Sequence, residues 1–260
     1  MITFGLIGQN ISYSKSPAIH HYMSRYLNIP FRYEILDTKR EDIPSLLAEL
    51  KTGRYHGFNV TIPYKEDVMK YVDRLTPSAN RIGAVNTIYY KEGRIFGDNT
   101  DYEGFKGLLT LNKVKVKNKH VYILGSGGAA KAVYAVLTDM QAIVTVVSRK
   151  PHLSDVFSRV IGYQSMNPDD IDLIVNATPV GTYPHVEDSP LNLDLVKQKT
   201  VIDLIYQPLQ TTLVQHAKRG IGGMDMLIIQ ALHSEMHWLD QKIKIKTSYI
   251  KKIKEDILHE

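Results

Sequence analysis

Apolar positions along the first half of the chain form short runs that alternate with stretches of helical spacing. The runs at residues 2–8 (ITFGLIG), 31–36 (FRYEIL) and 55–62 (YHGFNVTI) are typical of strands. NTIYY (86–90) and RIFGD (94–98) predict a hairpin across residues 91–93. Helices are expected between these strands, at about 16–28, 41–51 and 100–111 and from Pro63 onward.

The second half repeats the alternation more regularly. Its predicted strands are 119–124 (KHVYIL), 142–148 (AIVTVVS), 172–177 (DLIVNA) and 200–206 (TVIDLIY). Helical spacing covers 131–140, 211–219 and 223–240. Strands that alternate with helices predict an α/β fold with parallel sheet covered on both faces. A length of 260 residues predicts two domains.

The amino-acid composition excludes several classes of protein. Apolar residues make up 43% and charged residues 23% of the chain, which is typical of a globular protein. The absence of cysteine excludes disulfides, thiolate nucleophiles, Fe–S clusters and cysteine-based zinc sites, and it fits a reducing compartment. No apolar run approaches the ~18 residues of a membrane span, and MITFGLIG lacks the basic start of a signal peptide. We therefore expect a soluble cytoplasmic protein that has no membrane partner.

The net charge of +5 comes from one segment. Residues 242–254 hold six lysines and no acidic residue, and the remaining chain has 26 basic and 27 acidic residues. Ile250, Ile253 and Ile257 recur at helical spacing, which predicts a terminal helix with a solvated lysine face. A nucleic-acid patch would need interleaved aromatic residues or a known motif, and neither occurs, so no nucleic-acid partner is expected.

A glycine-rich turn opens the second predicted domain between a strand and a helix. Its residues are Gly125, Ser126, Gly127, Gly128, Ala129 and Ala130. Such a turn lets the backbone approach a pyrophosphate at a helix N-terminus, although a plain tight turn has the same composition.

The next predicted strand ends about 20 residues further on, where an NAD enzyme has an acidic residue. Ser148, Arg149 and Lys150 stand there instead. The two cations would attract a 2′-phosphate, so the turn predicts NADP(H) binding. The alternative is a pair of solvated loop cations.

Polar side chains gather at three places in the first half. Ser14 and Ser16 flank a predicted helix start, where hydroxyls cap helices or bind a carboxylate. Asn59 and Thr61 share one face of a strand end. Lys65 is expected on the first turn of the helix from Pro63, where a cation opposes the helix dipole, which suggests a chemical role. Asp101 follows the hairpin and could cap the next helix.

Eight stretches in order along the chain resemble the shikimate dehydrogenase family, which consists of NADP-dependent enzymes of aromatic amino-acid biosynthesis. They are SYSKSP (12–17), GFNVTIPYK (57–65), IGAVNT (82–87), GDNTDYEG (97–104), GSGGAAKA (125–132), NATPVG (176–181), DLIYQPLQT (203–211) and GGMDMLIIQA (222–231). The resemblance implies a substrate-binding α/β domain at 1–102 plus about 240–260, with a C-terminal helix that returns to it. It also implies a Rossmann-type NADP-binding domain at 103–239.

The same resemblance implies a role for each matching residue. Ser14 and Ser16 would hold the substrate carboxylate, and Lys65 would be the catalytic lysine, paired with Asp101. The ring hydroxyls would be held by Thr61, Asn86, Asp101 and Gln230, with Asn59 beside them. Tyr206 would lie near both substrate and nicotinamide, and the cofactor would contact Leu204, Gly223, residues 125–129 and residues 148–150. No metal is required.

The implied reaction is the reversible reduction of 3-dehydroshikimate to shikimate by NADPH. The chain departs from the family's usual Asn-Arg-Thr at 148–150, which leaves the strength of the NADP preference open. A broader quinate/shikimate dehydrogenase is one alternative. A non-catalytic NADP(H)-binding regulator is another, although a degenerate site would be expected to lose Lys65 or Asp101. We expect Trp238 to serve in packing and the protein to be a monomer or a weak homodimer.

Overall fold

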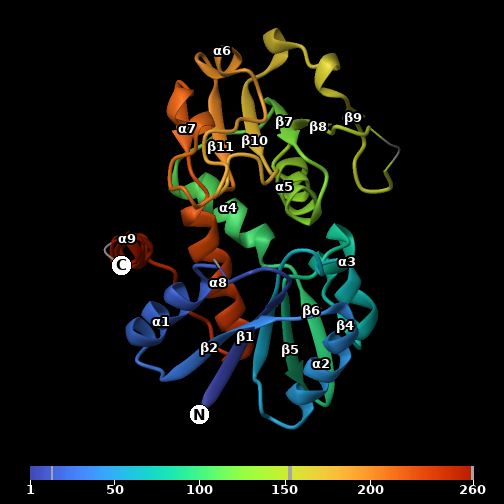
Figure 1. Ribbon diagram of the computed structural model, residues 1–260, viewed down its shortest axis with the longest axis vertical. Helices are drawn as coiled ribbons and strands as arrows, with labels where there is room; N and C mark the ends of the chain where they lie inside the picture. The colour runs from blue at the N-terminus through green and yellow to red at the C-terminus, as the bar shows by residue number, and fades with distance from the viewer. Residues whose placement is uncertain (13, 152–153, 259–260) are drawn as a thin grey trace. The chain divides into compact units, whose positions relative to one another are not determined.

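The computed structural model describes residues 1–12, 14–151 and 154–258 (Figure 1), so Tyr13 of the SYSKSP stretch lies outside the described residues. Two compact units are formed, one from Met1–Gly104 with Ile228–Glu260 and the other from Phe105–Leu227. Helices α4 (Asp101–Leu111) and α8 (Met224–Trp238) each begin in one unit and end in the other. Both units have sheets flanked by helices, which confirms the predicted α/β class.

The first unit is built on a mixed sheet with the strand order β2-β1-β3-β5-β6-β4. Its strands are β1 (Ile2–Gly8), β2 (Phe31–Asp37), β3 (Gly57–Val60), β4 (Arg74–Leu75), β5 (Thr87–Lys91) and β6 (Arg94–Asp98). β1 runs parallel to β2 and β3, and Ile7 lies opposite Val60. The carboxyl ends of β1 and β3 therefore meet at one edge of the sheet. β5 and β6 form the predicted antiparallel hairpin.

Helices α1 (Ser16–Leu27), α2 (Ile43–Lys51), α3 (Pro77–Ile82) and α9 (Thr247–Leu258) complete the first unit. The 3₁₀ helices η1 (Arg40–Asp42) and η2 (Asp67–Tyr71) also belong to it. Trp238 stacks on Phe4 with ring centroids 4.4 Å apart, and its indole nitrogen donates to the carbonyl of Ile88. A Cβ atom at Gly57 would lie 2.1 Å from the Trp238 ring, so this contact needs glycine. Trp238 is a packing residue, as predicted.

The helix expected from Pro63 is absent from the described chain. Residues 62–66 form turns that lead into η2, and the carbonyl of Lys65 accepts from the amide of Val85 at 2.7 Å. Because this long-range bond takes the carbonyl that an α-helix would pair with residue 69, no helix propagates through Lys65. The expectation that Lys65 opposes a helix dipole is therefore wrong.

The main difference between the compact units and the expected domain limits lies in α8, and residues 103–104 also group with the first unit. Residues 228–239 group with the first unit, whereas we expected the cofactor domain to extend to residue 239. The reason lies in the second half of α8. Ser234 and Glu235 are fully buried, and their side chains bond to Asn59 and His20 of the first unit.

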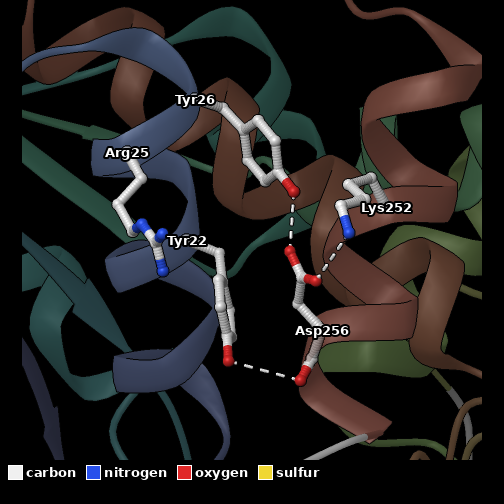
Figure 2. Close-up of a pocket in the computed structure, with 5 residues that line it drawn as sticks. All are labelled: Tyr22, Arg25, Tyr26, Lys252 and Asp256. Atoms are coloured by element: carbon white, nitrogen blue, oxygen red, sulfur yellow. Dashed lines mark hydrogen bonds and ion pairs between the residues drawn. The ribbon is translucent and has the colours of Figure 1, made fainter.

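The terminal helix returns to the first unit, as the resemblance implies. α9 lies beside α1 (Figure 1), with Ile250, Ile253 and Ile257 buried. Figure 2 shows the residues that line a pocket between them, which are Tyr22, Arg25, Tyr26, Lys252 and Asp256. The volume of this pocket is about 450 Å³.

The side chains of this pocket bind one another. The Tyr26 hydroxyl donates to Oδ2 of Asp256 at 2.6 Å, and Lys252 pairs with Oδ1 at 3.1 Å. Burial, together with the carboxylate, raises the pKa of Tyr26 to about 12. None of the predicted site residues lines this pocket, and its polar contacts fasten α9 to α1.

The second unit contains a parallel sheet of six strands in the order β12-β11-β10-β7-β8-β9. The strands are β7 (His120–Leu124), β8 (Ile143–Val147), β9 (Val160–Ile161), β10 (Leu173–Asn176), β11 (Thr200–Asp203) and β12 (Arg219–Ile221). Its helices are α5 (Gly128–Asp139), α6 (Leu193–Val196) and α7 (Thr212–His216), with η3 (Tyr163–Ser165) and η4 (Pro168–Asp170).

This strand order is that of the Rossmann fold, in which ligands bind beyond the carboxyl ends of the strands where the order reverses. Here the reversal lies at β7, whose neighbours are β8 and β10. Among the residues that the structure describes, no helix is long and apolar enough to cross a membrane.

Candidate active site

A buried network of polar side chains surrounds the Asp101 carboxylate in the first unit. Oδ1 of Asp101 accepts from the Asn86 amide nitrogen at 2.9 Å, and Oδ2 accepts from Nζ of Lys65 at 2.5 Å. The Asn86 amide nitrogen also lies 3.4 Å from Oε1, the side-chain amide oxygen, of Gln230 on α8. The side chains of Lys65 and Asp101 are 18% and 9% exposed, so water weakens this ion pair less than it would at a surface. The structure thus joins four predicted site residues.

The β5–β6 hairpin and the turn after it bring Asn86 and Asp101 together. Thr87 at the start of β5 lies opposite Asp98 at the end of β6. Asn86, which precedes β5, is therefore close to the turn that follows β6 and leads to Asp101. Oδ1 of Asn99 accepts from the amide of Asp101 at 3.1 Å, and its amide nitrogen donates to the carbonyl of Ala84. Asn99 therefore binds the free backbone amide at the start of α4, and the Asp101 carboxylate is turned to Lys65 and Asn86 instead.

Asn59 is bound on both sides of its amide. Its oxygen accepts from the Tyr33 hydroxyl at 2.8 Å. Its nitrogen donates to the carbonyl of Asn86 at 3.1 Å, to Oγ1 of Thr87 at 3.3 Å and to Oγ of Ser234 at 2.9 Å. Asn59 is 5% exposed and so belongs to the layer that holds Asn86 in place.

Sequence reasoning missed Thr87 and Ser234 as members of this network. Both are fully buried, and their hydroxyl oxygens lie 2.8 Å apart. Ser234 follows Gln230 by one helical turn, so the two side chains share one face of α8. That spacing was a usable signal once Gln230 had been singled out.

Ser14 and Ser16 form a pair of their own. Ser14 Oγ lies 3.1 Å from Ser16 Oγ and accepts from the amide of Ser16 at 3.2 Å. The residue at the N-cap position of α1 is Lys15, which makes no side-chain capping bond. Neither serine is therefore the N-cap residue of α1, although Ser14 does bind the first backbone amide of that helix.

The Ser14 turn and Thr61 lie at the same edge of the sheet. The amide of Ser14 donates to the carbonyl of Ile11 in the turn that follows β1, and Thr61 follows β3. A Cβ atom at Gly8, the last residue of β1, would lie within 3 Å of both Ile11 and Thr61 side chains. The absence of a side chain at Gly8 thus lets the two segments approach each other.

The glycine turn of the second unit fits a dinucleotide phosphate. Gly125 adopts φ +100°, which L side chains rarely adopt, and it follows β7 directly. α5 begins at Gly128, and its N-cap Gly127 supplies no side chain to the helix end. A Cβ atom at Gly127 would meet no atom within 4 Å in the described structure. Ser126 and Ala129 flank this open helix end, whose amide groups suit an anion.

Ser148, Arg149 and Lys150 form the turn that follows β8, the strand next to β7. Ser148 Oγ accepts from the amide of Lys150 at 3.3 Å and lies 3.2 Å from its carbonyl, which closes the turn. The side chains of Arg149 and Lys150 are exposed. Their place beside the glycine turn suits a nucleotide that carries an extra phosphate.

Leu204, Tyr206 and Gly223 lie in the segments that follow β11 and β12. A Cβ atom at Gly223 would lie 2.1 Å from the carbonyl oxygen of Leu204, so the two backbones touch. Below them, burial raises the pKa of Asp203, which accepts from Thr211, from Asn176 and from the amide of Ile205. Asp203 therefore ties the end of β10 to the segment that follows β11.

Taken one by one, the units suggest complementary chemistry. The first carries a lysine–carboxylate pair among amides and hydroxyls, which suits a small polyhydroxyl acid. The second carries a Rossmann turn followed by two cations. These features define a two-unit α/β oxidoreductase that uses a nicotinamide dinucleotide.

Comparison with known proteins specifies the family. Residues 6–88 match the family model described as the shikimate dehydrogenase substrate binding domain. The chain is 37% identical over 254 residues to the shikimate dehydrogenase (NADP⁺) of Clostridium beijerinckii, covering 92% of this chain and 94% of that protein.

Solved structures agree. Shikimate dehydrogenase 1 from Peptoclostridium difficile matches with a TM-score of 0.87 and 37% identity, covering 100% of this chain and 98% of that one. The Thermus thermophilus enzyme, solved in complex with NADP(H) and shikimate, matches with a TM-score of 0.87 and 32% identity, covering 99% of this chain and 100% of that one. The chain belongs to the shikimate dehydrogenase family of NADP-dependent oxidoreductases of the shikimate pathway.

Proposed function

We propose that this protein catalyses the reversible, NADPH-dependent reduction of 3-dehydroshikimate to shikimate. The observation that carries the proposal is the Lys65–Asp101 pair in the first unit, which is bonded to Asn86, and Asn86 in turn contacts Gln230. An ammonium group held beside amides suits a substrate that carries a carbonyl next to hydroxyl groups. The solved Thermus thermophilus relative, in complex with NADP(H) and shikimate, supports this substrate.

The polar residues of the first unit divide the recognition of the substrate among them. Ser14 and Ser16 bind its carboxylate through their hydroxyls. The ring hydroxyls are bound by Thr61, Asn86, Asp101 and Gln230. These contacts exist before and during the reaction, so they contribute to substrate binding more than to the chemical step.

Lys65 performs the proton chemistry. When bound, the dinucleotide supplies the hydride chemistry. As the substrate carbonyl is reduced, negative charge grows on its oxygen, and the Lys65 ammonium stabilises that charge and donates the proton. Asp101 orients the ammonium through its Oδ2 contact while Asn86 holds the other carboxylate oxygen. In the reverse direction Lys65 takes the proton back.

The second unit holds the dinucleotide. The open amide groups at Gly127–Ala129 bind the pyrophosphate, and Arg149 and Lys150 bind the 2′-phosphate. Leu204, Tyr206 and Gly223 contact the nicotinamide half. The Asp203 carboxyl keeps this last segment in place through its bond to the amide of Ile205.

An NADP⁺-reduction assay with shikimate tests the proposal directly. We expect NADPH to form with shikimate and to form much more slowly, or not at all, with quinate. Equal turnover of quinate would favour the broader dehydrogenase. Binding of NADP⁺ without turnover of either acid would favour a regulator and contradict the proposal.

The compartment and the assembly are further parts of the proposal. We propose that the protein acts in the cytoplasm as a monomer or a weak homodimer. Light scattering after size-exclusion chromatography at several concentrations measures the mass of the assembly. A stable tetramer would contradict this part and leave the proposed activity untouched.

A further inference from the structure

Two ionisable side chains are sealed inside the first unit next to the proposed substrate residues, and the mechanism above does not use them. His20 on α1 and Glu235 on α8 are both fully buried, with Nδ1 and Oε1 2.8 Å apart. Burial lowers the pKa of His20 to about 3 against the opposing effect of the Asn59 side chain, and burial raises the pKa of Glu235 well above its ordinary value. Burial therefore favours the neutral form of both groups, in which the Glu235 carboxyl group can donate to Nδ1 of His20.

Burying such a polar pair costs free energy, so the pair is a poor means of stabilising the contact between two helices. Nε2 of His20 and Oε2 of Glu235 make no hydrogen bond in the described structure. Replacing a buried polar pair by packed apolar side chains is often neutral or stabilising. The polar pair instead provides a directional contact. Because a hydrogen bond has a preferred geometry, it fixes the rotation of α8 about its axis relative to α1.

The pair closes a ring of contacts around Asn59. Glu235 is adjacent in α8 to Ser234, whose hydroxyl accepts from the Asn59 amide at 2.9 Å. The other side of that amide accepts from the Tyr33 hydroxyl at 2.8 Å. The Tyr33 ring stacks on His20, with centroids 4.0 Å apart and an interplanar angle of 10°. We call these residues, His20, Tyr33, Asn59, Ser234 and Glu235, the Asn59 ring.

The Asn59 ring leads directly to the proposed substrate residues. Asn59 donates to the carbonyl of Asn86, whose side chain binds Asp101. Ser234 donates to the carbonyl of Gln230 one turn earlier in α8. A rotation of α8 would therefore displace both Asn86 and Gln230.

We propose that Glu235 and His20 are positioning residues for substrate recognition, which fix Asn59 and the polar face of α8 so that Asn86 and Gln230 meet the substrate hydroxyls in a preset arrangement. This inference rests on the proposed function, because it assigns to the Asn59 ring the support of that same site. It predicts that damage to the ring weakens substrate binding selectively. Cofactor binding depends on other residues, and the proton-transfer step depends on the ring only indirectly, through the contact of Asn86 with Asp101.

Variants of Glu235 separate positioning from folding. Glu235→Gln keeps a donor that can reach Nδ1 of His20, whereas Glu235→Met keeps the length and removes the donor. We expect Glu235→Met to raise the KM for shikimate roughly 5- to 12-fold, the effect of losing about one neutral hydrogen bond. The kcat should change less than about threefold and the KM for NADP⁺ should not change. Glu235→Gln should keep the shikimate KM within about twofold of the unaltered enzyme.

Leu50→Ala is the matched control for lost stability. Leu50 is buried in α2, in a separate core cluster that contains none of the Asn59 ring. Its truncation should lower the Tm and leave the shikimate KM unchanged. A general loss of stability would therefore not imitate the expected result.

The unaltered enzyme is assayed first, so that failure of the proposed activity is seen separately. The inference is overturned if Glu235→Met folds and keeps the shikimate KM of the unaltered enzyme. It is also overturned if Glu235→Met raises the KM for shikimate and the KM for NADP⁺ equally. Glu235→Gln as damaging as Glu235→Met would overturn it too. If Glu235→Met does not fold, Tyr33→Phe decides, since it removes only the hydroxyl bonded to Asn59. We expect a raised shikimate KM for Tyr33→Phe, and an unchanged one contradicts the inference.

Discussion

The ammonium of Lys65 is held 2.5 Å from one oxygen of Asp101, whose other oxygen is occupied by Asn86. The two charges come from segments 36 residues apart, one in a turn after β3 and one at the start of α4. The carboxylate is therefore held at both of its oxygens, and in the proposed mechanism the lysine is the member that meets the substrate oxygen. This relationship is the centre of the proposed mechanism.

The cation turn after β8 should set the choice of cofactor. A charge-assisted bond to phosphate contributes about 1.5–3 kcal/mol, so Arg149→Ala should reduce the preference for NADPH over NADH by roughly 10- to 150-fold in kcat/KM. The loss should appear mainly in the KM for NADPH. Steady-state kinetics with both cofactors measure it. Arg74→Ala, which removes an exposed arginine from the first unit, is the control for net charge and should have no such effect.

The serine pair should act on substrate binding. Ser14→Ala or Ser16→Ala should raise the KM for shikimate more than it lowers kcat, because the carboxylate contact exists in both ground and transition states. The Tm should change little, since neither serine is the N-cap of α1. A large fall in Tm with an ordinary shikimate KM would show instead that the pair supports the fold.

Alanine substitutions at two glycines of the second unit should distinguish an effect on cofactor binding from an effect on folding stability. Gly127→Ala adds a methyl group to open space and should leave the Tm unchanged while it weakens NADP⁺ binding, because the phosphate approaches the backbone there. Gly223→Ala forces a Cβ atom to within 2.1 Å of the Leu204 carbonyl and should lower the Tm as well. Thermal unfolding and NADP⁺ titration of both variants test this. Equal Tm values for the two variants would contradict the prediction.

The buried pair His20–Glu235 should give the unfolding free energy an unusual pH dependence. Their ordinary pKa values are 6.5 and 4.5. Above pH 6.5 the unfolded chain holds no proton at either group, whereas burial raises the pKa of Glu235 and so favours retention of one proton in the folded pair. Stability from this pair should therefore fall as pH rises above 6.5, by at most about 1.4 kcal/mol per pH unit.

The pair makes no net contribution to this slope between pH 4.5 and 6.5, where folded and unfolded chains each hold one proton. Below pH 4.5 the unfolded chain holds two protons and the folded pair one, so stability falls again on acidification toward the folded His20 pKa of about 3. Glu235→Gln removes the retained proton and should abolish the fall above pH 6.5. Urea unfolding from about pH 5 to 8 measures both curves, and parallel curves would contradict the prediction.

Local patterns were enough to predict most of the fold. The strand–turn–helix at β7 and α5 was foreseen because a short apolar run, three glycines and a helical stretch follow one another directly. The β5–β6 hairpin was foreseen for a similar reason. The helix expected at Lys65 failed because its carbonyl pairs with Val85, and no local pattern contains that bond.

The buried residues that position the proposed substrate-binding residues were harder to predict from the sequence. Lys65, Asn86 and Asp101 were found because they lie in recognisable stretches. His20 and Glu235 are 215 residues apart and meet only when α1 and α8 have packed. Buried partners of this kind have no spacing rule, so geometry alone identified them.

A double-mutant cycle on Lys65 and Asp101 tests the central claim most directly, with kcat and KM for shikimate measured on the unaltered protein, Lys65→Ala, Asp101→Ala and the double variant. If Lys65 donates the proton, Lys65→Ala should lower kcat by about 10²–10⁴-fold with a much smaller change in KM. Asp101→Ala should also be severe, and the double variant should lose less than the product of the single losses, because the pair acts as one unit. A Lys65→Ala enzyme that keeps a near-normal kcat and shows only a raised KM would mean that Lys65 merely positions the substrate, and would contradict the account.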